Sequence, residues 1–134
     1  MCLFLLACSP NAFAQDSTGW IAGGTRPDEY TMSGDPTVSH GSDGCGYIGS
    51  RVVHAKWFGT WMSYTSSDKF LGKRLRLTAY VRTKNVEGWA GLWLRIDSAN
   101  MVLLPDNMSN RPLKGSHDWQ QCISYWMFLN RART

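Results

Sequence analysis

Apolar and polar residues alternate almost without exception over residues 74–82. The apolar positions are Leu75, Leu77, Ala79 and Val81, and the positions between them are Arg74, Arg76, Thr78, Tyr80 and Arg82. A period of two is typical of a β-strand with one buried face. We therefore predict a strand over 75–82 whose aliphatic face packs against a core.

A second strand is predicted over residues 89–96. Its apolar face carries Ala90, Leu92, Leu94 and Ile96, whereas the other face carries Trp89, Gly91, Trp93 and Arg95. The intervening residues 84–88 are mostly polar and end in glycine, a composition that favours a tight turn. We expect 75–82 and 89–96 to be neighbouring antiparallel strands.

The outward face of this strand pair is the candidate binding surface, formed by Tyr80, Arg82, Trp93 and Arg95. A flat aromatic ring can stack on a sugar ring or a peptide side chain, and arginine can pair two oxygens at once. Trp and Arg are also enriched at the energetic centres of interfaces. The alternative is that this face packs under a loop, for example 106–108, or against a partner domain.

The remainder of the chain also favours an all-β fold. Short apolar runs alternate with turn-forming residues, which include 13 glycines and five prolines among 134 residues. No stretch of a dozen residues keeps a helical period. The length predicts one domain, and a hydrophobic content of 43% allows a real core, in which most of the seven tryptophans are expected to lie.

Four motifs resemble a bacterial jelly-roll domain: Gly72-Lys73-Arg74, Glu87-Gly88-Trp89-Ala90-Gly91-Leu92-Trp93, Asp106-Asn107-Met108 and Arg111-Pro112. That family is similar to the galactose-binding-like β-sandwiches. Its members occur alone, beside AraC-type transcription regulators and ahead of some secreted peptidases. The resemblance covers about residues 20–121 and implies an all-β jelly-roll β-sandwich.

The resemblance ends close to Gln120. The family continues there with a strand containing Leu-Asp-Val-Pro, whereas residues 125–128 of this chain read Tyr-Trp-Met-Phe. Read one base earlier, the codons of these four residues encode Leu-Asp-Val whichever synonymous codons are used. We infer a frameshift between about Gln120 and Tyr125, so that residues 122–134 form an aberrant tail and the closing strands of the sandwich are missing. A divergent final strand is the alternative.

Residues 1–14 have the features of an export signal. An apolar run spans residues 2–8, and Ala12-Phe13-Ala14 has the small-x-small form of a cleavage site, although no Lys or Arg precedes the run. We expect cleavage after Ala14, which leaves a β-sandwich domain over 15–121. The alternative is a lipoprotein signal with a lipid anchor on Cys8. The run is too short for a transmembrane span, which needs about 20 apolar residues.

The formal net charge of +4 does not indicate a nucleic-acid-binding protein. Arg131 and Arg133 lie in the expected tail, and without them 12 basic residues stand against 10 acidic ones. The basic cluster of Lys73, Arg74 and Arg76 is typical of a solvated strand edge.

No motif predicts catalysis, a metal site or a cofactor. Cys45 is the one cysteine outside the two ends of the chain, so no disulfide framework is predicted. The cysteines and histidines lack the spacing of metal ligands, and the common nucleophile, zinc-protease and phosphate-binding motifs do not occur. We expect a protein that is not an enzyme and holds neither a metal nor a cofactor.

A structural role is expected for the loop that carries Asp106, Asn107 and Arg111. Asp and Asn side chains brace turns by hydrogen bonding to nearby backbone. Either Arg95 or Arg111 is expected to form an ion pair with Asp106. We prefer this structural role to a ligand-binding one.

Together these expectations describe a non-catalytic module, periplasmic or secreted, that binds a carbohydrate or another component of the cell envelope. One alternative is a cytoplasmic sensory or accessory domain related to AraC-type transcription regulators. Another is a non-functional remnant of a disrupted gene. A functional leader would exclude the cytoplasmic alternative.

Overall fold

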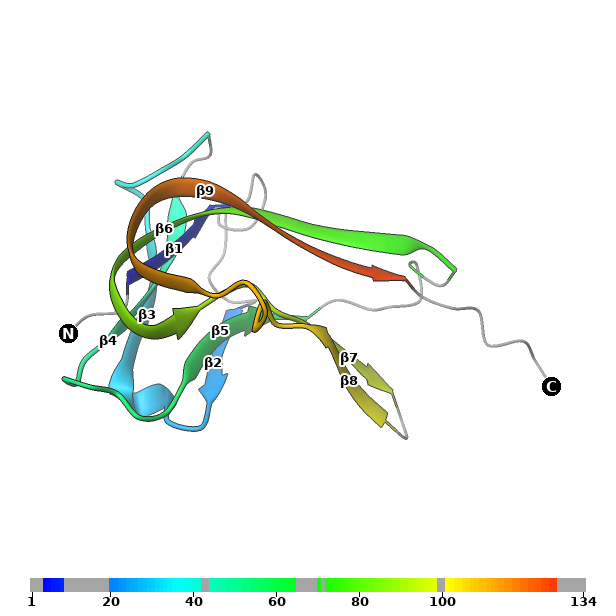
Figure 1. Cartoon of the computed structure of the whole chain (residues 1–134), viewed down its shortest axis with the longest axis horizontal. Helices are drawn as coiled ribbons and strands as arrows, with labels where there is room; N and C mark the ends of the chain where they lie inside the picture. The colour runs from blue at the N-terminus through cyan, green and yellow to red at the C-terminus, as the bar shows by residue number, and fades with distance from the viewer. Residues whose placement is uncertain are drawn as a thin grey trace.

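The computed structural model of the chain describes residues 4–8, 20–41, 44–64, 70, 72–98 and 101–127, with the backbone alone for 4–8, 98, 101–105 and 127. The described residues are mostly in strands, which confirms the all-β class (Figure 1). A short 3₁₀ helix spans Pro27–Glu29. The strands are β1 (Phe4–Cys8), β2 (Trp20–Gly24), β3 (Tyr30–Asp35), β4 (Cys45–Ser50), β5 (Gly59–Ser63), β6 (Arg74–Ala90), β7 (Leu94–Ser98), β8 (Met101–Asp106) and β9 (Leu113–Met127).

Five of these strands form the main sheet, in the order β3-β4-β1-β6-β9, and every neighbouring pair is antiparallel. β2 pairs with β5, and β7 pairs with β8, in two small two-stranded sheets. Figure 1 shows the long strands β6 and β9 running side by side and bending together, while the β7–β8 pair points away from them. The bend brings the last residues of β6 toward the segment between β4 and β5.

The main core lies along β6. Ala79 and Val81 are buried, as the alternation predicts, and Tyr80 between them is exposed. The same cluster contains Val86 and Ala90 of β6, together with Met108, Leu113 and Cys122. The pairing of β6 with β9 therefore closes an apolar strip that runs from Ala79 to Ala90 in β6 and from Leu113 to Cys122 in β9.

The predicted hairpin between 75–82 and 89–96 is wrong. Residues 74–90 form the single strand β6, whose partner is β9, and residues 94–98 pair with β8 instead. The residues that we read as a turn lie where the β6–β9 register shifts, with Asn85 at a φ of 53°. The Asn85 N–H donates to the Ser116 hydroxyl at 2.9 Å, across from the turn-forming Gly115. Asn85 in β6 and Gly115 in β9 therefore let the two paired strands bend together, because asparagine and glycine tolerate a positive φ.

The expected domain boundary after Gln121 lies inside β9. Residues 122–126 continue the pairing with residues 75–79, and both Cys122 and Ser124 are buried. In the structure these residues therefore belong to a paired strand, and the domain boundary stays a prediction. The frameshift is a statement about the gene and stays a prediction.

The N-terminal residues 4–8 form β1, in the middle of the main sheet. Cleavage after Ala14 stays a prediction, and it would remove this strand. Cys45, at the start of β4, is disulfide-bonded, although the sequence predicted no disulfide framework. Cys122 is a free thiol, and its burial raises its pKa.

Candidate functional site

A cleft of about 390 Å³ with exposed aromatic walls lies between residues 55–58 and the end of β6. Its aromatic rim consists of Trp57, Phe58 and Trp89, whose exposed fractions are 56%, 59% and 47%. The remaining walls are formed by Thr25, Tyr30, Ser50, Ala55, Lys56, Glu87 and Gly88. Large apolar side chains gathered at a hollow and left in water are typical of an interaction site. We call this feature the aromatic cleft.

A hydrogen bond from Tyr30 holds the backbone at Trp57. The buried Tyr30 hydroxyl donates to the Trp57 carbonyl at 2.6 Å, and burial raises the pKa of this phenol. Gly59 makes this arrangement possible, because a Cβ at Gly59 would stand only 2.6 Å from the Tyr30 ring. The indole of Trp57 is therefore exposed while its backbone is fixed.

The backbone at Phe58 is held by the end of β2. The N–H groups of Thr25 and Arg26 both donate to the Phe58 carbonyl, at 3.1 and 3.3 Å. The Thr25 hydroxyl accepts a hydrogen bond from the Phe58 N–H at 3.2 Å. Gly24 has a φ of 104°, and a Cβ there would lie 2.5 Å from the Phe58 carbonyl oxygen. This approach of two backbones requires glycine, and it leaves the phenyl ring of Phe58 exposed on a fixed support.

A side-chain contact joins the segment before the cleft's aromatic rim to the end of β6. The Nδ1 atom of His54 lies 2.8 Å from a carboxylate oxygen of Glu87. His54 has a φ of 54°, an uncommon conformation for a residue other than glycine, which tends to occur at functional loops. Both side chains are well exposed, so the contact contributes little to stability and serves mainly to orient the segment.

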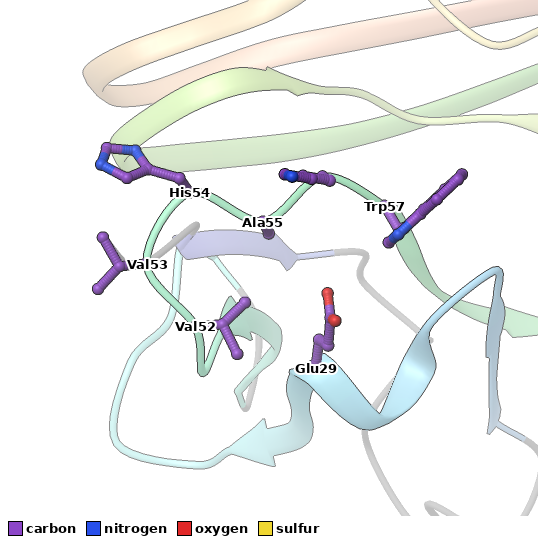
Figure 2. A pocket seen from close by; sticks show the side chains of 7 residues that line it. Glu29, Val52, Val53, His54, Ala55 and Trp57 are labelled. Carbon is purple, nitrogen blue, oxygen red and sulfur yellow. The ribbon is translucent and has the colours of Figure 1, made fainter.

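A second, smaller hollow of about 230 Å³ lies along residues 52–57 and shares Ala55, Lys56 and Trp57 with the cleft. Figure 2 shows Glu29 pointing from the 3₁₀ helix toward this segment, with Val52, Val53 and His54 on its outer turn. The Glu29 carbonyl accepts the Arg51 N–H at 2.7 Å, so the segment is also fixed where it begins. Lys56 and Trp57 therefore line both hollows.

The sequence-predicted residues Tyr80 and Arg82 lie elsewhere, on the main sheet. The Tyr80 ring contacts the His40 ring at a centroid distance of 4.3 Å, and the Arg82 guanidinium lies 5.1 Å from the centre of the Trp119 ring. His40 also stacks on Trp119 at 5.2 Å. The segment that carries His40 therefore packs against this face, whereas the alternative that we drew from the sequence named the 106–108 loop.

The other predicted pair, Trp93 and Arg95, lies beside the small sheets. The Trp93 indole N–H donates to the Thr60 hydroxyl at 2.6 Å, and Arg95 lies over the Trp93 ring at 5.8 Å while pairing with Asp97 at 2.8 Å. The structure thus places the four predicted residues in two separate clusters, one on the main sheet and one next to β5. Their role in ligand binding stays a prediction.

The loop of Asp106, Asn107 and Arg111 is a hydrogen-bonded network. Arg111, and not Arg95, pairs with Asp106 through two hydrogen bonds, and it also donates to the Ile123 carbonyl at 2.8 Å. Asp106 accepts from the buried Ser124 hydroxyl and from the Met108 N–H, while Asn107 accepts from the Ser109 N–H. These interactions hold the pKa of Asp106 well below its usual range, with the Arg111 hydrogen bond as the largest cause, partly opposed by burial.

Sequence reasoning missed two of the three rim residues. Trp57 and Phe58 stand in an aromatic run, Trp57-Phe58-Gly59-Thr60-Trp61-Met62, which the alternation of apolar and polar positions does not single out. Trp89 was placed on an outward face, and it is exposed. The available signal was the pair of glycines at 24 and 59, but their contacts with Phe58 and Tyr30 depend on the tertiary structure.

Among the residues that the structure describes, no three His, Cys, Asp or Glu side chains gather in a way that could hold a metal ion. No helix among those residues is long and apolar enough to cross a membrane.

One curated protein is clearly similar to this chain. It comes from Bacillus subtilis (strain 168) and is described as an uncharacterized HTH-type transcriptional regulator, YbfP; it is 42% identical over 103 residues, which are 75% of this chain. The chain spans about a third of that relative's length, since the match covers 35% of it. No family model matches the chain. No solved structure matches it either.

Proposed function

We propose that this chain is a non-catalytic ligand-binding module whose site is the aromatic cleft. The observation that carries the proposal is the exposure of Trp57, Phe58 and Trp89, together with the hydrogen bonds that already hold the backbone at Trp57 and Phe58 in place. A site that is ordered before binding loses little conformational entropy when a ligand arrives, so more of the contact energy appears as affinity. The burial of each exposed ring would contribute about 1–2 kcal/mol.

The ligand class that fits this cleft is a carbohydrate or a glycan of the cell envelope. Aromatic faces pack against the apolar faces of sugar rings, while Lys56 and Glu87 supply one donor group and one acceptor group at the same cleft. An open cleft of this size suits one or two sugar units. We also propose the finer fold assignment on the same resemblance, a jelly-roll β-sandwich of galactose-binding-like type, and export of the module through the leader.

A second candidate function is supported by the relative. A sensory or accessory domain of a transcription regulator would need the same kind of small-molecule cleft, and the Bacillus subtilis protein is described as an HTH-type regulator. The two candidates differ in location. Mass spectrometry of the protein from the producing cell separates them, because cleavage after Ala14 supports the exported module and an intact Met1 in the cytoplasm supports the regulator domain.

The cleft is tested with single substitutions on its rim. A panel of mono- and oligosaccharides is screened by isothermal titration calorimetry, and Trp57→Ala and Trp89→Ala are then measured with any sugar that binds. We expect each substitution to weaken binding about 10-fold or more, since loss of an aromatic contact costs about 1–3 kcal/mol at such a site.

Tyr64→Ala is the matched control, because Tyr64 is equally exposed and does not line the cleft. It should bind as the parent does. Equal losses for Tyr64→Ala and Trp57→Ala would count against the aromatic cleft as the site. Binding that survives both rim substitutions but is lost in Trp93→Ala or Arg95→Ala would restore the surface predicted from the sequence.

A further inference from the structure

The five-residue strand β1 occupies the central position of the main sheet, between β4 and β6. It pairs on one side with β4, where Leu6 is opposite Tyr47, and on the other with β6, where Leu6 is opposite Arg82. Both pairings are antiparallel, so β4 and β6 run in the same direction with β1 between them. Neighbouring strands lie about 4.8 Å apart, so β4 and β6 stand about 10 Å apart and cannot pair with each other unless one of them moves.

The two strands beside this position are among the most buried of the described chain. Ile48 and Ser50 of β4 are buried, as are Val81 and Thr83 of β6. If β1 left, the inward-facing N–H and C=O groups of both strands would lose their partners next to this apolar surface. Unpaired backbone groups at a buried edge are costly, and they readily accept another extended segment.

Residues 4–8 are joined to the rest of the fold through the same segment in which we expect export cleavage. Cleavage after Ala14 would cut the chain between β1 and β2, which begins at Trp20. After such a cut, the remaining chain would keep the five-residue strand only through its pairing with β4 and β6 and through any disulfide. Cleavage of the leader would therefore also decide whether the main sheet keeps its central strand.

We propose that the gap between β4 and β6 is a strand-accepting site, and that its ligand is the apolar segment Phe4–Cys8, bound within its own chain or, after cleavage, as a separate peptide. This is binding by β-strand addition, in which backbone hydrogen bonds supply affinity and the buried neighbours supply selectivity for uncharged apolar residues. The central position requires a segment without proline, because every inner N–H has a partner to meet. The proposal is independent of the aromatic cleft.

The test uses the full chain in reducing buffer, so that no disulfide contributes. Leu6→Pro removes a backbone donor in the middle of β1, and Ala12→Pro places the same change outside β1 as a control. We expect Leu6→Pro to lower the urea midpoint clearly and Ala12→Pro to leave it unchanged. A synthetic peptide of residues 3–9, with two lysines appended for solubility, is then added to the Leu6→Pro chain.

The peptide should raise the midpoint of the Leu6→Pro chain as its concentration increases, because a ligand that binds only the folded state stabilises it by mass action. The same peptide with Pro at the position of Leu6 should have no effect. Where Leu6→Pro does not fold alone, refolding is carried out with each peptide, and recovery is expected with the parent peptide only.

Three results would overturn the proposal. The first is a Leu6→Pro chain with the parent midpoint, which would show that the sheet does not need β1. The second is equal action of the two peptides, which would show a non-specific apolar effect. The third is a destabilised or unfolded Leu6→Pro chain on which neither peptide acts, which would show that the gap does not accept a strand from outside.

Discussion

The aromatic cleft and the surface predicted from the sequence use the same residue types in opposite ways. In the cleft, the rings of Trp57 and Trp89 are exposed, and a hydrogen bond from Tyr30 holds the backbone at Trp57. In the predicted surface, Trp93 is hydrogen-bonded to Thr60 and Arg95 is paired with Asp97 and stacked over Trp93. Aromatic and cationic residues on an outward strand face can therefore be satisfied by their own neighbours, and a ligand site is distinguished by the rings that lack such neighbours.

The polar network around Asp106 is held together by hydrogen bonds within the protein, and breaking it should give the largest change in stability. Asp106→Asn removes the charge that Arg111 and the buried Ser124 hydroxyl meet, and we expect a loss of about 2–3 kcal/mol in the free energy of unfolding at pH 7. Ligand binding at the aromatic cleft should be unchanged. Chemical denaturation and calorimetry of the same protein preparation check both parts.

The same network sets a pH dependence with a definite sign. The pKa of Asp106 is lower in the folded state than in the unfolded chain, where it is about 3.9, so the unfolded chain binds the proton first as the pH falls. The stability that this group contributes is complete well above pH 4 and is lost on acidification below it. Denaturant midpoints between pH 7 and pH 2.5 should fall more steeply for the parent than for Asp106→Asn, and parallel curves would contradict this account.

A pair of tryptophan substitutions contrasts the two regions directly. Trp93→Ala removes a half-buried, hydrogen-bonded ring and should cost about 2 kcal/mol of stability, whereas Trp57→Ala removes an exposed ring and should cost about 0.5 kcal/mol. For ligand binding the order should be reversed. Thermal or urea unfolding of both variants decides the first part, and equal losses of stability would show that the comparison between the regions is wrong.

The smallest expected effect distinguishes the hydrogen bonds that hold the cleft's backbone from the side chains that would contact a ligand. Tyr30→Phe deletes the hydroxyl that holds the Trp57 carbonyl and alters none of the three rim side chains. We expect a stability loss of about 1 kcal/mol and a several-fold loss of affinity. Thr25→Val removes the corresponding hydroxyl at Phe58 and should act in the same direction. Unchanged affinity in both variants would mean that the hydrogen bonds do not order the site.

The sequence by itself determined the all-β class and the inward face of residues 75–81, because a period of two depends only on the alternation of side chains along a strand. It also named Arg111, five positions away, as one of two candidate partners of Asp106, and the structure shows that Arg111 is the partner. These features depend on short-range rules. A residue whose partner lies close in the sequence has few alternative partners.

Only the tertiary structure decided which strands pair and which aromatic rings remain open. Residues 84–88 have the composition of a turn, yet they form a bend in β6 because β9 supplies a matching bend and a hydroxyl for Asn85. The cleft requires contacts between residues about 30 positions apart, such as Tyr30 with Trp57 and Thr25 with Phe58. Composition cannot reveal such contacts, since the same tryptophan is a packed residue or a binding surface according to what the rest of the chain places against it.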